Sequence, residues 1–177
     1  AKYRSKKREI NKGEIVLTPQ SGKPTVDTVW IVEHPKENIK YKAAVDSTNV
    51  DANTSNSTSN KSNFATAIGK EADAFNPYSA VAWYINKPEN RYECEKVSLL
   101  LSRYYAKFGN LKNDNFKMYP ERNAGGGSSL VSLFKQEGFG KLLQGFFAEH
   151  NTDSKKTKGD AIGYYRDGNF MEYQMRM

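Results

Sequence analysis

The chain has 177 residues, enough to bury a hydrophobic core within one domain of ordinary size. Its 27 Lys and Arg residues outnumber its 20 Asp and Glu residues, which gives a net charge of +7, and its 12% aromatic content is too high for a disordered chain. The single cysteine excludes an intrachain disulfide and a cysteine-based zinc site, and no apolar run is long enough to span a membrane. The composition indicates a soluble protein of a reducing compartment, and the charge favours a polyanionic partner such as nucleic acid.

Residues 1–40 are expected to form a basic arm followed by short strands. Five of the first eight residues are Lys or Arg, so this stretch is either a solvated tail or an arm that contacts phosphates. Residues 14–18 and 28–32 are rich in β-branched and aromatic residues and are each followed by a proline, which predicts two strands. We therefore separate this leading part from a main domain over residues 41–177.

Three further strands are predicted in the first half of the main domain, at residues 41–46, 64–69 and 78–85. Residues 47–63 consist mostly of Ser, Thr, Asn, Asp and Ala, which predicts a long polar loop. Because residues 41–45 are rich in Ala and Val and have strand-like runs around them, we expect them at the centre of a mixed sheet.

Helices and strands alternate in the second half. Cys94, Val97, Leu101, Tyr104 and Phe108 recur three or four residues apart, which predicts a helix over residues 92–108 that packs this face on the sheet. The remaining expected elements are a strand at 116–119, a helix at 128–137, a strand at 141–148 and an unfinished helix at 169–177. Strands interspersed with helices predict an α/β fold, a mixed sheet flanked by helices.

Two acidic residues follow predicted strands and are candidate metal ligands. Asp46 ends the strand 41–46, and Glu121 comes just after the strand 116–119. Carboxylates at the carboxyl ends of two strands can converge at one edge of a sheet, where a hard cation such as Mg²⁺ would offset their repulsion. Asp51, in the polar loop, is a candidate auxiliary ligand. The alternative is that Asp46 is a turn residue and Glu121 is a solvated one.

A glycine-rich loop follows Glu121. Asn123, Gly125 and Gly126 lie between the predicted strand and the next helix, where small residues permit close approach of a bulky ligand to the backbone. No Gly-Lys-Ser/Thr sequence follows, so this is not a phosphate-binding loop of the Walker A type. A flexible hinge is the alternative interpretation.

These motifs resemble the nuclease domain of the large terminase subunit of tailed bacteriophages, which has a ribonuclease H-like fold. In that family the first strand of the sheet ends in an acid within a Gly-Val-Asp-Pro-like motif, and residues 44–47, Ala-Val-Asp-Ser, stand in that place. Residues 121–126, Glu-Arg-Asn-Ala-Gly-Gly, look like the family's Glu-x-Asn-x-x-Gly motif, and the loop around residues 155–158 is similar to its Thr-x-x-Thr-Lys region. The order of elements resembles the family's over residues 40–177.

The resemblance implies a metal-dependent endonuclease that cuts concatemeric double-stranded DNA during packaging of a viral genome. Asp46 and Glu121, with Asp51, would hold two Mg²⁺ or Mn²⁺ ions for phosphodiester hydrolysis. Lys155, Lys156 and Lys158, with Arg122, would contact DNA phosphates. The partners implied are an ATPase motor domain, the small terminase subunit and the portal protein, in the cytoplasm of an infected bacterium and without a membrane.

The chain also departs from this family. Ser47 replaces the usual proline, and the following polar loop is long. The family's last acid lies on a helix beyond the point where this sequence ends, and Asp160 and Asp167 come too early to replace it. We therefore expect a domain truncated at its C-terminus, and this fragment could be inactive. The alternatives are a non-catalytic nucleic-acid-binding or virion interaction domain, or another ribonuclease H-like nuclease such as a junction resolvase.

Overall fold

The structure is a computed structural model of the whole chain. It describes residues 2–5, 17–19, 21–47, 63–72, 74, 78–86, 91–106, 115–121, 126–139 and 146–147.

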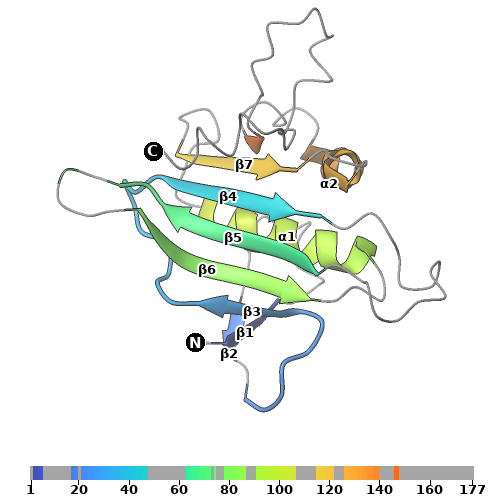
Figure 1. Cartoon of the computed structure of the whole chain (residues 1–177), viewed down its shortest axis with the longest axis horizontal. Coiled ribbons are helices and arrows are strands. Elements are labelled where there is room, and N and C mark those ends of the chain that lie inside the picture. The colour runs from blue at the N-terminus through green and yellow to red at the C-terminus, as the bar shows by residue number, and fades with distance from the viewer. Residues whose placement is uncertain are drawn as a thin grey trace, which may run out of the picture.

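The described strands form one mixed sheet in the order β2-β1-β3-β6-β5-β4-β7 (Figure 1). Neighbouring strands are antiparallel except β4 and β7, which are parallel. The strands are β1 (Lys2–Ser5), β2 (Leu17–Pro19), β3 (Thr28–Ile31), β4 (Tyr41–Asp46), β5 (Phe64–Lys70), β6 (Ser79–Asn86) and β7 (Phe116–Pro120). Phe147 extends the pairing beyond β7 through a parallel bridge to Met118.

Two α-helices in the described part of the chain accompany the sheet. Helix α1 (Arg91–Ala106) lies behind β4, β5 and β6 in Figure 1 and contacts all three. Helix α2 (Gly126–Phe134) contacts α1 and β7 and continues into a π-helical turn, η4 (Lys135–Phe139). The predicted α/β class, with a mixed sheet and helices, is confirmed.

The hydrophobic core lies between the sheet and the helices. On β4 and β7 alternate residues face this core, because successive side chains of a strand point to opposite faces. The predicted helix face is confirmed for four of its five residues, since Cys94, Val97 and Leu101 are at most 1% exposed and Tyr104 is 8% exposed; Phe108 lies outside the described residues. Aromatic rings fill the end of the core near β7: Phe116, Phe134, Phe146 and Phe147 contact one another at centroid distances of 4.6–5.2 Å.

Two expectations about the sheet were wrong. Strand β4 has a neighbour on each side, but β6 is the central strand of the described sheet, because β3, β1 and β2 add to the β6 side. The basic start of the chain is not only a tail or an arm, since residues 2–5 form β1 between β2 and β3. Pairing with two neighbouring strands outweighs the weak strand propensity of this Lys- and Arg-rich segment.

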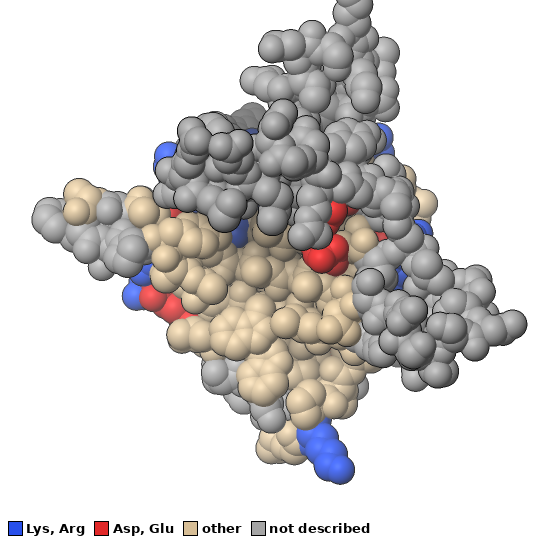
Figure 2. All heavy atoms as spheres, viewed as in Figure 1, with Lys and Arg blue, Asp and Glu red and all other residues tan. Residues whose placement is uncertain are grey.

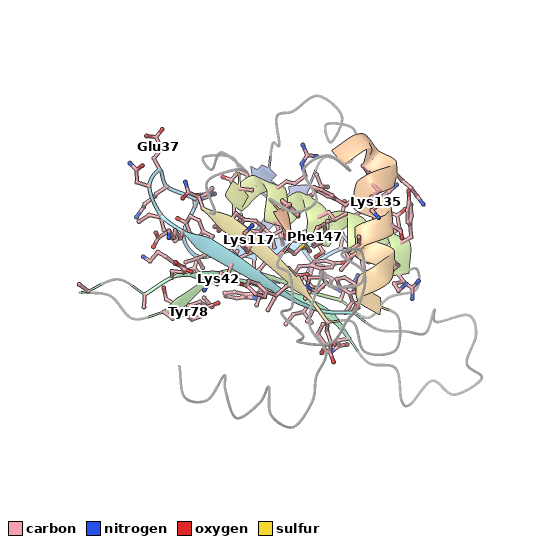
Figure 3. The ribbon with its side chains drawn as sticks, turned by 90° about the horizontal axis from the view of Figure 1, so that it is seen from above. Glu37, Lys42, Tyr78, Lys117, Lys135 and Phe147 are labelled. Carbon is pink, nitrogen blue, oxygen red and sulfur yellow. The ribbon has the colours of Figure 1, made fainter. Side chains whose placement is uncertain are left out.

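The face of the sheet that points away from α1 is called the open face below. Rows of paired residues cross the strands, and every second row points its side chains to this face. Three such rows make up the open face. Figure 3 shows Lys42 and Tyr78 on this side of the sheet, opposite α1. Several of its apolar side chains are exposed to solvent, including Ile85 at 56% and Tyr78 at 58%.

Cys94 provides a test of the core. It is the only cysteine of the chain, it is fully buried, and burial raises the pKa of its thiol. Both effects suppress the reactive thiolate. We expect a thiol reagent at pH 8 to modify the native protein at least about 1,000-fold more slowly than the unfolded protein, because native chains open to the unfolded state at fractions of about 10⁻³ or less. Rapid modification under native conditions would contradict the burial of the α1 core face.

Candidate metal centre at the ends of β4 and β7

The candidate metal centre lies where the only parallel pair of described strands ends. Val45 of β4 is paired with Pro120 of β7, and the backbone N–H of Glu121 donates to the carbonyl oxygen of Val45 at 2.8 Å. Asp46 and Glu121 are therefore the next pair of positions along the two strands. Neighbouring strands lie about 4.8 Å apart, so the two backbones hold these acids side by side.

Alternation along the strands determines the direction of the two carboxylates. Val45 and Pro120 are buried in the core. Asp46 and Glu121 follow them directly, and consecutive residues of a strand point to opposite faces, so both acids belong to the open face. Asp46 is exposed, whereas Glu121 is only 9% exposed. Figure 2 shows acidic side chains on this face near the ends of β4 and β7.

The donor set suits a hard divalent cation. Two adjacent carboxylates repel each other unless a cation or proton lies between them, and Mg²⁺ is usually bound through one or two carboxylates plus water and substrate oxygens. Ser47, directly after Asp46, is 8% exposed and its buried Oγ has no hydrogen-bond partner in the described part of the chain. Among the described residues, no group of three or more His, Cys, Asp or Glu side chains is arranged to hold a metal ion.

The other candidates from the sequence are mostly outside the described residues. This applies to Asp51, Arg122, Asn123, Gly125, Lys155, Lys156 and Lys158. Gly126 is described and is the first residue of α2. The structure thus places Asp46 beside Glu121 and the start of α2 five residues after Glu121, and it says nothing of the predicted DNA-contacting lysines.

A buried carboxylate that the sequence analysis did not single out joins the two helices. Glu95 of α1 is 2% exposed, accepts a hydrogen bond from the Ser129 Oγ of α2, and pairs with the Arg91 Nε at 3.3 Å. These groups line an open cleft of about 310 Å³ between the helices. Arg91 and Glu95 have the i, i+4 spacing of a helical ion pair, which is a visible signal, but nothing in the sequence identifies Ser129 as their partner.

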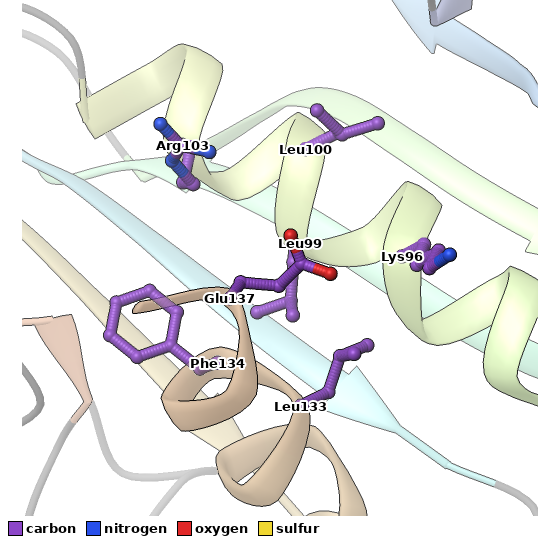
Figure 4. Close-up of a pocket in the computed structure, with 7 residues that line it drawn as sticks. All are labelled: Lys96, Leu99, Leu100, Arg103, Leu133, Phe134 and Glu137. Carbon is purple, nitrogen blue, oxygen red and sulfur yellow. The ribbon is translucent and has the colours of Figure 1, made fainter. Parts of the chain in front are cut away.

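A second pocket between α1 and α2 is too small for a ligand. Figure 4 shows its lining, which combines the apolar side chains of Leu99, Leu133 and Phe134 with the charged side chains of Lys96, Arg103 and Glu137. Its volume of about 10 Å³ is at most that of one water molecule. Burial lowers the pKa of the Arg103 guanidinium, and the nearby Glu137 carboxylate opposes that change. This pocket is a feature of helix packing, and the acid pair is the better candidate site.

Two comparisons with known proteins found no match. No protein-family model matches the chain, and no curated protein is significantly similar to it. None of the described helices is both long and apolar enough to cross a membrane. The chain is thus defined by its own features: an α/β protein with a mixed sheet and an acid pair at the ends of two parallel strands.

Proposed function

We propose that this chain is a metal-dependent endodeoxyribonuclease domain with a ribonuclease H-like fold, of the kind found in phage DNA-packaging terminases. The observation that carries the proposal is the juxtaposition of Asp46 and Glu121 on adjacent parallel strands. These residues are 75 positions apart in the sequence, and either could have been an isolated turn or surface residue. A shared metal site requires them to be neighbours, and they are.

The order of elements also supports the proposal. The terminase resemblance requires a strand that ends in an acid, two more strands, a helix, a second acid-ending strand and another helix. Strands β4, β5 and β6, helix α1, strand β7 and helix α2 follow one another in this order. Because β4 and β7 are parallel and adjacent, both acids reach the same edge of the sheet.

The chemistry proposed is hydrolysis of a phosphodiester bond. Two divalent ions at such a site activate a water molecule and stabilise the leaving oxygen. Asp46 and Glu121 would hold the ions on the open face, with Asp51 as an auxiliary ligand. Lys155, Lys156, Lys158 and Arg122 would bind duplex phosphates without reading the bases. The ATPase motor, small terminase and portal protein are the proposed partners, in the cytoplasm of the infected bacterium.

Two measurements test the proposal. The first is nicking of supercoiled plasmid in Mg²⁺ or Mn²⁺, with abolition by a chelator as the expected result. The second is thermal unfolding with added Mn²⁺, which requires no activity. Manganese at 100 times its Kd stabilises a single-site protein by about 2.7 kcal/mol, which corresponds to a rise of roughly 5–11 °C in Tm.

The two results distinguish a nuclease from a binding domain. Glu37→Gln is the control for unspecific metal binding, since Glu37 is an exposed carboxylate in the loop before β4, as Figure 3 shows. Stabilisation that persists in Glu37→Gln supports a specific site. Stabilisation without cleavage would mean a metal-binding domain that lacks nuclease activity in this fragment. The absence of both responses would refute the metal centre.

A further inference from the structure

The open face of the sheet carries a regular arrangement of side chains beside the acid pair. One row of paired positions crosses the sheet from β7 to β3, and it consists of Tyr119, Ala44, Ala67, Trp83 and Trp30. The next row, toward the ends of β4 and β7, leads from Asp46 to Ala65 and Ile85. The middle of the face is thus a strip of three small residues, called the alanine strip: Ala44, Ala65 and Ala67.

The two tryptophans form an aromatic platform beside the alanine strip. Trp30 and Trp83 are direct cross-strand partners, their ring centroids are 6.5 Å apart, and their planes differ by only 13°. Both side chains are partly exposed. Two nearly parallel ring faces suit two successive bases of a nucleic acid strand, because stacked bases are parallel to each other. Figure 2 shows that the middle of this face is largely uncharged.

The platform is close enough to the acid pair for one ligand to reach both. Trp83 is paired with Ala67, whereas Asp46 is paired with Ala65, which precedes Ala67 by two residues in β5. Two strand spacings and two residue rises separate Trp83 from Asp46, which gives roughly 12 Å between their backbones. This distance corresponds to three to four nucleotides of a strand, at a rise of about 3.4 Å per nucleotide. The intervening alanines permit a close approach to the sheet.

Two lysines lie on the open face beside the alanine strip. Lys117 and Lys42 are paired in the row on the other side of Ala44, away from the acids. The Lys42 Nζ forms an ion pair with the Glu71 carboxylate at 2.6 Å, so Lys42 adds little net charge to this face. The chain as a whole carries a net charge of +7, which favours an anionic occupant. A polyanion with flat aromatic groups matches both features.

We propose that the open face binds a single strand of nucleic acid, with bases stacked on Trp30 and Trp83 and the backbone directed toward Asp46 and Glu121. Stacking on the two tryptophans requires unpaired bases, because the base faces of a duplex are covered by their neighbours in the stack, whereas contact of a backbone with the acid pair does not. The orientation toward the acids rests on the proposed nuclease function. The stacking does not, since it requires no metal.

The experiment uses the protein's own fluorescence. Trp30 and Trp83 are the only two tryptophans in the chain, so the emission reports on this platform alone. We would titrate the metal-free protein, in chelator, with an oligothymidylate of about 12 nucleotides, within the range of known single-strand site sizes. The expected result is saturable quenching of the tryptophan emission.

Variants at the platform test the stacking directly. Trp83→Leu should weaken oligothymidylate affinity by about 5-fold to about 150-fold, measured by fluorescence anisotropy of a labelled strand. Trp83→Phe keeps a ring and should restore part of the affinity, which a merely structural loss would not predict. Tyr92→Leu is the matched control, because Tyr92 is an exposed aromatic residue on α1. It should bind like the wild type, and circular dichroism would confirm that each variant is folded.

Four results would overturn the proposal. A duplex that quenches as strongly as the single strand would exclude base stacking. Inorganic polyphosphate that competes fully would show that charge alone binds. Tryptophans inaccessible to acrylamide would mean that protein covers this face, and unchanged emission at saturating oligothymidylate would mean that no strand reaches it. If the protein does not cleave plasmid but the oligothymidylate still quenches its tryptophan emission, the nuclease function is refuted and the strand-binding face remains.

Discussion

Asp46→Asn should abolish the response of this protein to divalent metal while leaving its fold intact. Asparagine has the size of aspartate but lacks its charge, so the acid pair loses half of its negative charge at the position between β4 and β7. Loss of an outer-shell partner of a metal typically costs 10- to 100-fold in affinity or activity. We expect the loss of a direct ligand to exceed that range, about 100-fold or more in the rate of plasmid nicking.

The stability of the metal-free variant makes this test specific. Asp46 is exposed, and surface substitutions usually change the free energy of unfolding by no more than about 0.5 kcal/mol. Asp46→Asn should therefore melt like the wild type in chelator and fail to gain stability from Mn²⁺. Glu121→Gln, directly after β7, should also lose the stabilisation by Mn²⁺. A normal Mn²⁺ response in both variants would place the metal elsewhere or nowhere.

Leu101→Ala should strongly destabilise the protein. Leu101 is fully buried in the middle of the helix, within the core cluster that joins α1 to the sheet. Removing a buried leucine side chain costs about 2–5 kcal/mol, because hydrophobic contacts are lost and a cavity remains. For a chain of this length each kcal/mol corresponds to about 2–4 °C, so Tm should fall by roughly 4–20 °C.

Val32→Ala is the control for this prediction. Val32 is 67% exposed, and its truncation should change the free energy of unfolding by less than about 0.5 kcal/mol. Urea denaturation of both variants, analysed with a common slope, measures the difference. Equal midpoints for the two variants would mean that Leu101 does not belong to a tightly packed core.

Local patterns predicted most of the elements. The spacing of Cys94, Val97, Leu101 and Tyr104 identified both α1 and its buried face, because helical periodicity is a property of adjacent turns. The strands β3, β4, β5, β6 and β7 were likewise visible as short runs of strand-forming residues between polar segments. The acids at the ends of β4 and β7 followed from these boundaries.

Pairing between distant segments could not be predicted in the same way. The composition of residues 41–45 suggested the centre of the sheet, yet β4 is next to β7, the last strand of the described sheet, and β6 is central. Alanine is compatible with either place in the sheet, so composition alone did not decide. The neighbours Trp30 and Trp83 are far apart in the sequence, and only the register of β3 with β6 brings them together. The pairing of β1 with β3 is non-local for the same reason.

The parallel pairing of β4 with β7 has a consequence for the order of folding. It joins residues 75 positions apart, such as Tyr41 and Phe116, whereas β5 and β6 are joined by a short connection. Contacts between distant residues form late, because the entropy lost on closing a loop grows with its length. The antiparallel strands and α1 can associate before β7 arrives. Asp46 and Glu121 become neighbours only in that last step, so the proposed metal site would form only after β7 has docked beside β4.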